Sequence, residues 1–221
     1  MSKVVVAVTG LFMVLFLLGH MTGNLQMYLG QETMNVYAET LQGLGGLLWV
    51  IRGALLLFLV LHVITSVRLK ALNLSARPEP YAVKNYVRAT LTSRTMIWSG
   101  VMLFLFIVYH LLHFTVKATN PAYDGLFDAV GRPDVYSMVI LGYSNVLISM
   151  VYIAAMILLG FHLFHAIESM FQTLGINHPK YNPFIHGLSV TLSTIIVVGF
   201  TMVPVGVLAG WIALPAGVIV L

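Results

Sequence analysis

Residues 95–116 have the sequence TMIWSGVMLFLFIVYHLLHFTV, which contains no Lys, Arg, Asp or Glu. A helix of about 20 apolar residues crosses the roughly 30 Å hydrocarbon layer of a membrane. Four further apolar stretches lie at residues 4–27, 44–69, 139–171 and 185–208. Continuous apolar runs do not suit the alternating strands of a β-barrel. We therefore expect an all-α membrane protein with five transmembrane helices in a single domain, residues 1–221.

The composition agrees with residence in a lipid bilayer. Hydrophobic residues make up 59% of the 221 positions and charged residues 8%, whereas soluble domains have about 45–50% apolar and about 25% charged residues. The mean hydropathy is +0.95. The formal net charge of +4 is interpreted as a sign of membrane topology, because basic residues concentrate in cytoplasmic loops. We expect no nucleic-acid partner.

Cysteine is absent, and histidine is unusually frequent. Without cysteine, the chain has no disulfide, no thiolate-ligated iron–sulfur cluster and no thiolate-bound haem. Any metal must be bound by His, Met or a carboxylate. The eight histidines outnumber the seven Asp and Glu residues. Ionisable groups inside a membrane are costly and are usually functional, so these histidines are the first candidates for a site.

The distribution of basic residues predicts the orientation. Lys and Arg favour cytoplasmic loops, and eight of the 11 fall on the side of the N-terminus: Lys3, Arg68, Lys70, Arg77, Lys84, Arg88, Arg94 and Lys180. The other side receives Arg52, Lys117 and Arg132. We therefore expect a multi-pass protein with its N-terminus in the cytoplasm. The basic connection between residues 68 and 94 has two interpretations, a topological anchor and a docking surface for a partner subunit.

Histidines occur in the interior of four of the five predicted spans, at positions 20, 62, 110, 113, 162 and 165; the fifth has only His186, at its start. His20 and His110 follow the basic residues that open their spans by 17 and 16 residues, or roughly 25 Å at the helical rise of 1.5 Å. His62 and His162 each precede a charged residue by six positions, or roughly 9 Å. The antiparallel order of the helices therefore predicts two histidine pairs, at levels about 15 Å apart.

Two imidazoles at one depth in a helix bundle suit a bis-histidine haem b, which leaves iron no open coordination position. Two such haems would make the chain an electron carrier. A bundle in which histidines only hydrogen-bond neighbouring helices is the alternative. His113 and His165 follow His110 and His162 by three residues and so share a helix face with them. On depth His110 and His162 are preferred as ligands, and His113 and His165 remain second-choice ligands or candidates for other bonds.

Three segments carry a resemblance to a known family. They are GHMTGNLQ at residues 19–26, HLFHAIESMFQTLG at residues 162–175 and NHPKY at residues 177–181. Together with the histidines on the first four spans, they resemble the cytochrome b558 family. Members of this family are the di-haem membrane anchors of succinate dehydrogenases and quinol:fumarate reductases. The resemblance extends over nearly the whole chain.

The resemblance implies two haem b groups in a bacterial cytoplasmic membrane. His20 and His110 would bind the distal haem, and His62 and His162 the proximal haem. Gly175 follows His162 by thirteen positions, which matches the family's spacing and favours His162 over His165. The partners implied are a flavoprotein subunit, an iron–sulfur subunit and a quinone, usually menaquinone. The direction of the overall reaction, succinate oxidation or fumarate reduction, stays open.

Other residues receive roles with open alternatives. The resemblance points to a carboxylate near the first outer loop at a quinone site, for which Glu39 is preferred over Glu32; a solvated loop acid is the alternative. His178 is a further candidate proton donor. Arg52 and Arg68 are candidate partners of haem propionates, since guanidinium groups match carboxylates, or they extend to lipid headgroups.

One departure from the family concerns position 160. Some fumarate reductases carry a glutamate two residues before the ligand of the fourth helix, where this chain has Gly160, so a proton route at that position is not expected. Two other functions remain as alternatives: a di-haem cytochrome of a different quinone-linked reductase, and a histidine-based proton or metal transporter.

Overall fold

A computed structural model describes residues 2–76 and 91–215. The described elements are α1 (Ser2–Leu25), the 3-10 turn η1 (Gln26–Leu29), α2 (Gln31–Gly43), α3 (Gly46–Ser75), α4 (Leu91–His110), the π-helix η2 (Leu111–Thr115), the 3-10 turn η3 (Pro121–Gly125), α5 (Val135–Ser144), α6 (Val146–Thr173) and α7 (Asn182–Leu208). Strand pairing in this part of the chain is limited to one isolated bridge, between Phe127 and Pro133. The protein is all-α.

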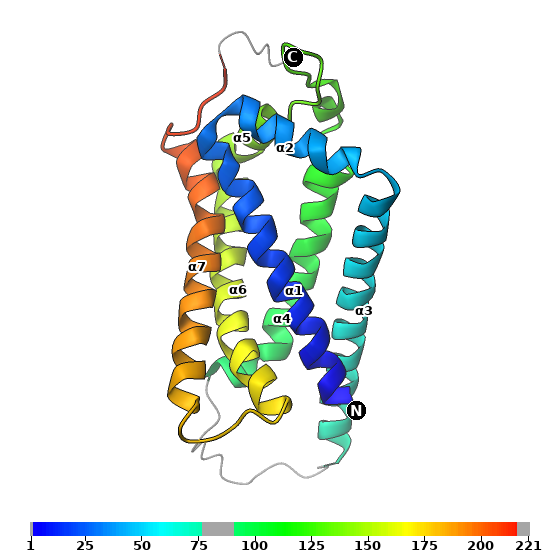
Figure 1. The fold of residues 1–221 in the computed structure, drawn as a ribbon, viewed down its shortest axis with the longest axis vertical. Coiled ribbons are helices and arrows are strands. Elements are labelled where there is room, and N and C mark those ends of the chain that lie inside the picture. The colour runs from blue at the N-terminus through cyan, green and yellow to red at the C-terminus, as the bar shows by residue number, and fades with distance from the viewer. Residues whose placement is uncertain (1, 77–90, 216–221) are drawn as a thin grey trace.

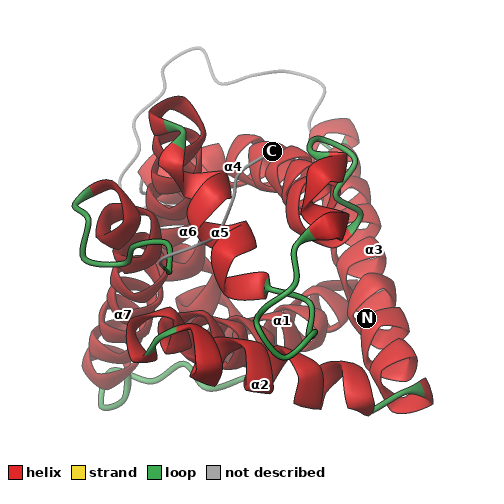
Figure 2. Ribbon diagram, turned by 90° about the horizontal axis from the view of Figure 1, so that it is seen from above, coloured by secondary structure: helices red, strands yellow, loops and turns green. Residues whose placement is uncertain are grey.

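Five helices are long and apolar enough to cross a membrane, and they cover residues 2–29, 46–75, 93–115, 146–173 and 182–208. The predicted fold class, an all-α membrane protein with five transmembrane helices, is confirmed. The long helices run alongside one another, and α2 lies across the end of the bundle opposite the N-terminus (Figure 1). Viewed along the bundle, α1, α3, α4 and α6 are arranged around a centre, and α7 lies outside it beside α6 (Figure 2).

The fourth predicted span, residues 139–171, begins too early. The chain bends at Asn145, whose backbone is extended and whose side chain accepts hydrogen bonds from the amides of Leu147 and Ile148, at 3.0 and 3.2 Å. Such a side-chain cap starts a new helix. Residues 135–144 therefore form the separate short helix α5, and the long helix begins at Val146. Hydropathy alone predicted a single span here because both helices are apolar.

The helices differ in how much of their surface they bury. α6 packs along α7, and α1 packs against α3, α6 and α7. Ile196 of α7 is fully buried, in a cluster with Leu163 and Ile167 of α6. By contrast, α3 has no buried residue along its 30 positions and packs mainly on α1. The tight part of the bundle is therefore α1, α6 and α7.

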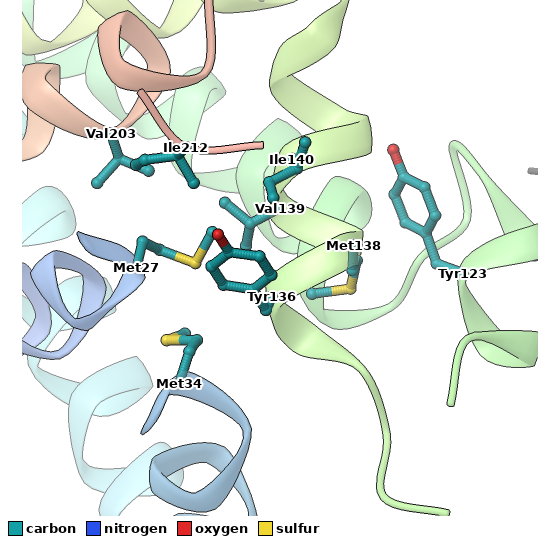
Figure 3. Close-up of a cluster of buried hydrophobic side chains, with 9 residues drawn as sticks. All are labelled: Met27, Met34, Tyr123, Tyr136, Met138, Val139, Ile140, Val203 and Ile212. Atoms are coloured by element: carbon teal, nitrogen blue, oxygen red, sulfur yellow. The ribbon is translucent and has the colours of Figure 1, made fainter. Parts of the chain in front are cut away.

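The end of the bundle opposite the N-terminus carries a compact layer, which we call the cap: η1, α2, residues 117–134 and α5. Its core combines Met27, Met34 and Tyr136, which point toward one another (Figure 3), with Val139 and Ile140 of α5. Residues 211–215 return to this layer, because Ile212 is buried there while Trp211 stays exposed. Residues 211–215 thus pack on the cap; residues 216–221 lie outside the described residues.

Polar groups tie the cap together around two buried side chains, Asp134 and Asn35. Asp134 caps the N-terminus of α5 by accepting from the amide of Ser137 at 3.1 Å, and it also accepts from Asn35 at 3.0 Å and from Gln31 at 2.8 Å. The Asn35 carbonyl oxygen accepts from the amide of Tyr136 at 3.0 Å. The polar side-chain atoms of Asp134 and Asn35 thus have protein partners in place of water, and α2 is bonded to α5.

Candidate functional site

A cavity of about 1630 Å³ runs along the centre of the bundle between α1, α3, α4 and α6. This exceeds the roughly 300–1,000 Å³ of usual small-molecule sites. Its lining includes five of the six span histidines: His20, His62, His110, His162 and His165. The sequence prediction that the first four helices bring histidines to a common interior is met by the geometry.

Near the cap, the rings of His20 on α1 and His110 on α4 lie next to each other in an edge-to-face arrangement, with centroids 5.9 Å apart and an interplanar angle of 76°. We call these two residues the cap-side pair. Phe16 stacks on His20 at 5.3 Å, and Phe106 stacks on His110 at 6.1 Å. The Asn24 side-chain amide donates to the carbonyl of His20 at 2.7 Å and lies 3.4 Å from its Nε2. Donation to Nε2 favours the tautomer in which this nitrogen carries a lone pair.

Toward the other end lie His62 and His162, which we call the N-side pair. The Thr9 hydroxyl donates to the carbonyl of Val5 at 2.7 Å, and its oxygen lies 3.2 Å from Nδ1 of His62. Since the hydroxyl proton is already used, the oxygen accepts from the Nδ1–H group. Nε2 of His62 then keeps its lone pair, as a metal ligand requires.

The second member of the N-side pair is held in the same way. The Ser99 hydroxyl donates to the carbonyl of Met96 at 3.0 Å, and its oxygen lies 2.9 Å from Nδ1 of His162. Metal-binding histidines usually donate their other ring N–H to a fixed acceptor, which sets the tautomer and the ring orientation. Both residues of the N-side pair have such an acceptor.

These contacts also fix the depth of the two pairs. Thr9 precedes His20 by 11 residues on α1, and Ser99 precedes His110 by 11 residues on α4. Eleven residues correspond to about 16 Å of helix, so the N-side pair lies about 16 Å below the cap-side pair on both sides of the cavity. This agrees with the separation of about 15 Å expected from the sequence.

Thr9 and Ser99 are site residues that the sequence analysis missed. The signal that would have found them is a repeat: residues 9–20, TGLFMVLFLLGH, align with residues 99–110, SGVMLFLFIVYH. The glycines of the repeat, Gly10 and Gly100, face the N-side pair. A Cβ added at these positions would be in ordinary contact, 3.4 Å from Cε1 of His62 and 3.6 Å from Cε1 of His162.

The two histidine doublets differ from each other. His162 and His165 both line the cavity, as their i, i+3 spacing predicts. Of His110 and His113, only His110 lines the cavity; α4 ends at His110 and continues as the π-helix η2, which carries His113. His113 is 2% exposed and is absent from the cavity lining; its Nδ1 lies 3.0 Å from the Tyr152 hydroxyl. The wider turn of a π-helix changes the direction of the side chain.

The charged residues that line the cavity are all basic: Lys3, Arg52, Lys70 and Arg94. Three of them sit at the end that carries the N-terminus, and Arg52 is near the cap, where its guanidinium lies 5.1 Å from the Trp49 ring. A smaller cavity of about 240 Å³ shares Arg52 with the large one and adds Lys117. Arg68 is exposed and is not among the lining residues; Arg77, Lys84 and Arg88 lie outside the described residues.

The candidate proton donors lie away from this cavity. Glu39 is exposed on α2 and does not line it. Glu32 is held by Arg132, which also binds Asp128 at 2.8 Å, and the hydrogen bond from this guanidinium lowers the pKa of Glu32. His178 is exposed in the connection before α7, at the opposite end from Glu39.

The structure gives a packing reason for the glycine at position 160. Gly160 of α6 faces α7 so closely that an added Cβ would lie 2.6 Å from Cγ2 of Val197. Real Cβ atoms do not approach so closely, and a valine side chain has little freedom to move away. A glutamate at this position would require α7 to shift.

The arrangement can hold two flat, apolar groups with anionic edges, each between two opposed imidazoles. Within residues 2–76 and 91–215, no group of three or more His, Cys, Asp or Glu side chains converges as a metal site. Compared with protein-family models, curated proteins and solved structures, the chain finds no match.

Proposed function

We propose that the chain is a di-haem cytochrome b that anchors a succinate:quinone oxidoreductase in the membrane. It would carry electrons between the iron–sulfur and flavoprotein subunits and menaquinone or another quinone. The observation that carries the proposal is the presence of two histidine pairs at two depths of one cavity, with the ring N–H of His62 and His162 bonded to helix hydroxyls.

The chemistry of the cavity supports haem as the occupant. Haem b is an apolar macrocycle with two carboxylates on one edge, and the cavity combines an apolar wall with a lining whose charged residues are all basic. Lys3, Lys70 and Arg94 are candidate partners for the carboxylates of one haem, and Arg52 with Lys117 for those of the other. With both axial positions filled by imidazole, a haem supplies reversible one-electron transfer and no site for oxygen.

In this proposal the protein residues bind, orient and exclude water. The N-side pair is the proximal site and the cap-side pair the distal site, if the N-terminus lies in the cytoplasm. Thr9 and Ser99 hold the imidazoles of the N-side pair in the ligand tautomer. The apolar walls around the rings keep water out and so affect the reduction potential. The quinone and its proton donors, for which Glu39 and His178 remain candidates, lie outside this pair of sites.

Haem content of the purified full chain tests the proposal. We expect a reduced-minus-oxidised spectrum of b type and two haems per chain. Ala substitution of His20 or His110 should remove the cap-side haem, and substitution of His62 or His162 the N-side haem. The matched control is His186→Ala, because His186 is largely exposed and pairs with Glu168 outside the cavity. A colourless chain, or full haem content in all four variants, would refute the proposal.

The partner assignment needs a separate test in native membranes. The chain should co-purify with a flavoprotein and an iron–sulfur protein, and addition of succinate should reduce its haems. Haem that is reduced only by a different donor would favour the cytochrome of another quinone-linked reductase. A colourless chain that moves divalent metal across vesicles would favour the transporter.

A further inference from the structure

We propose that Tyr152 and His113 form a positioning pair that sets the tautomer and the basicity of His110. The inference rests on the proposed function, in which His110 binds iron. His113 does not line the cavity, and Tyr152 was not among the site residues predicted from the sequence.

The geometry consists of one phenol between two imidazoles. The Tyr152 hydroxyl lies 3.0 Å from Nδ1 of His113 and 3.4 Å from Nδ1 of His110. The second distance is long for a hydrogen bond, and such bonds tighten when a site is loaded. Tyr152 is 4% exposed and His113 is 2% exposed, so water does not compete for these atoms.

Counting protons gives the direction of the bonds. A phenol has one proton to donate, whereas its oxygen can accept more than one bond. An iron-binding His110 needs the lone pair on Nε2, so its proton is on Nδ1 and is donated to the phenol oxygen. The phenol proton is then donated to Nδ1 of His113. The result is one continuous chain of donors, from His110 through Tyr152 to His113, in which each bond strengthens the next.

The surrounding residues position His113 and Tyr152 for this contact. The π-helix η2 turns the His113 side chain out of the cavity and toward Tyr152. Gly142 of α5 makes room for it, because an added Cβ would lie 3.2 Å from Cε1 of His113 and 2.8 Å from the Phe114 ring. Phe106 and Tyr143 pack edge-on against the Tyr152 ring at 5.0 and 5.1 Å. The phenol is therefore held in one orientation.

The pair differs in kind from the acceptors of the N-side histidines. Thr9 and Ser99 pass their own proton to a backbone carbonyl, whereas Tyr152 passes its proton to the basic nitrogen of His113. An acceptor for the ring N–H raises the basicity of a ligand imidazole. A more basic ligand stabilises the oxidised iron and lowers its reduction potential. His113 and Tyr152 thereby act on the cap-side haem alone.

Tyr152→Phe is the decisive variant, since it removes one hydroxyl and keeps the ring. At saturating haem, we expect a redox titration to show the cap-side potential raised and the N-side potential unchanged. The cap-side haem should also bind about 10- to 100-fold more weakly. The His20→Ala variant, which keeps only the N-side haem, assigns the two potentials. Tyr143→Phe is the matched control, because Tyr143 packs in the same ring cluster and should leave both potentials unchanged.

Two substitutions of His113 separate a positioning role from a packing role. His113→Gln keeps an acceptor for the phenol proton and should retain most of the parent cap-side potential. His113→Leu removes the acceptor and should raise that potential, by less than Tyr152→Phe. Unchanged potentials in Tyr152→Phe, or equal shifts of both potentials, would overturn this inference and leave the proposed function intact. A parent chain without haem would overturn both.

Discussion

The cap and the cavity-lined bundle are stabilised in different ways. In the cap, buried polar groups bond one another, as Asp134 does with Asn35, and methionine and tyrosine side chains fill the space between them. In the bundle, α3 has no buried residue and faces a cavity of about 1630 Å³. The first region is packed by its own side chains. The second encloses a cavity, which in our proposal holds haem.

The difference shows which parts of the chain are held by tertiary contacts. α1, α6 and α7 form a packed unit, and the cap ties α2 to α5 across the end of the bundle. The remaining interior surface is left apolar and lined with histidine. Such a design holds the position of α3 with contacts on α1 and, in our proposal, with the bound cofactor. The predictions below test this contrast, beginning with the largest expected effect.

Removal of haem should loosen the bundle and spare the cap. A ligand at about 1,000 times its dissociation constant stabilises the folded state by about 4 kcal/mol. We expect hydrogen exchange of chain made without haem to rise along α3 and to change little along α5. Equal protection of α3 with and without haem would mean that the cavity does not depend on its occupant.

Asp134→Ala should break the cap and leave the cavity intact. The substitution removes a helix cap and the shorter of the two bonds that the Asn35 amide donates, leaving the bond to Asp128 at 3.3 Å, at a combined cost of about 2 kcal/mol. Hydrogen exchange of α5 should report the loss, with haem content unchanged. Asp124→Ala is the control, since Asp124 forms an exposed pair with Lys117 at 2.8 Å and such pairs contribute about 0–1 kcal/mol.

Thr9→Val and Ser99→Ala should weaken the N-side haem site without affecting the cap. Each substitution removes the acceptor for one ring N–H, and loss of such a partner costs about 10- to 100-fold in affinity. That factor corresponds to about 1.4–2.7 kcal/mol. Haem titration of the purified variants measures it. Thr22→Val is the matched control, because the Thr22 hydroxyl donates within its own helix, to the carbonyl of Gly19; an equal loss there would contradict the assignment.

The smallest effect concerns the stability of the cap at low pH. Burial opposes the charge on Asp128, but hydrogen bonds from Arg132 outweigh it and lower its pKa, and the same guanidinium lowers the pKa of Glu32. The unfolded chain therefore binds more protons than the folded chain. The contribution of both acids is complete above their ordinary pKa values of 3.8 and 4.5. It is lost as the pH falls through the lowered folded-state values.

Hydrogen exchange of α2 over decreasing pH measures this loss. The variant Glu32→Gln has no carboxylate at this position and should lose less protection in acid than the parent. A parent cap whose protection does not change down to about pH 3 would contradict the role of Arg132.

The sequence alone determined much of the fold and part of the site. Span lengths follow from the 30 Å layer that they must cross, and the helical rise converts residue numbers into depth. The two levels of His20 with His110 and of His62 with His162 therefore followed from counting. The break at Asn145 was also within reach, since asparagine is a preferred helix cap, but an apolar average over a long window conceals one polar residue.

What only the tertiary structure decided is the direction in which side chains point. The i, i+3 spacing predicted that His113 would share the face of His110, yet His113 lies in a π-helix and does not line the cavity. Likewise, depth alone did not reveal that Arg68 lies outside the cavity lining while Lys70 is within it. Depth is a sum of identical steps along one helix, whereas direction depends on local helix geometry and on neighbours distant in the chain.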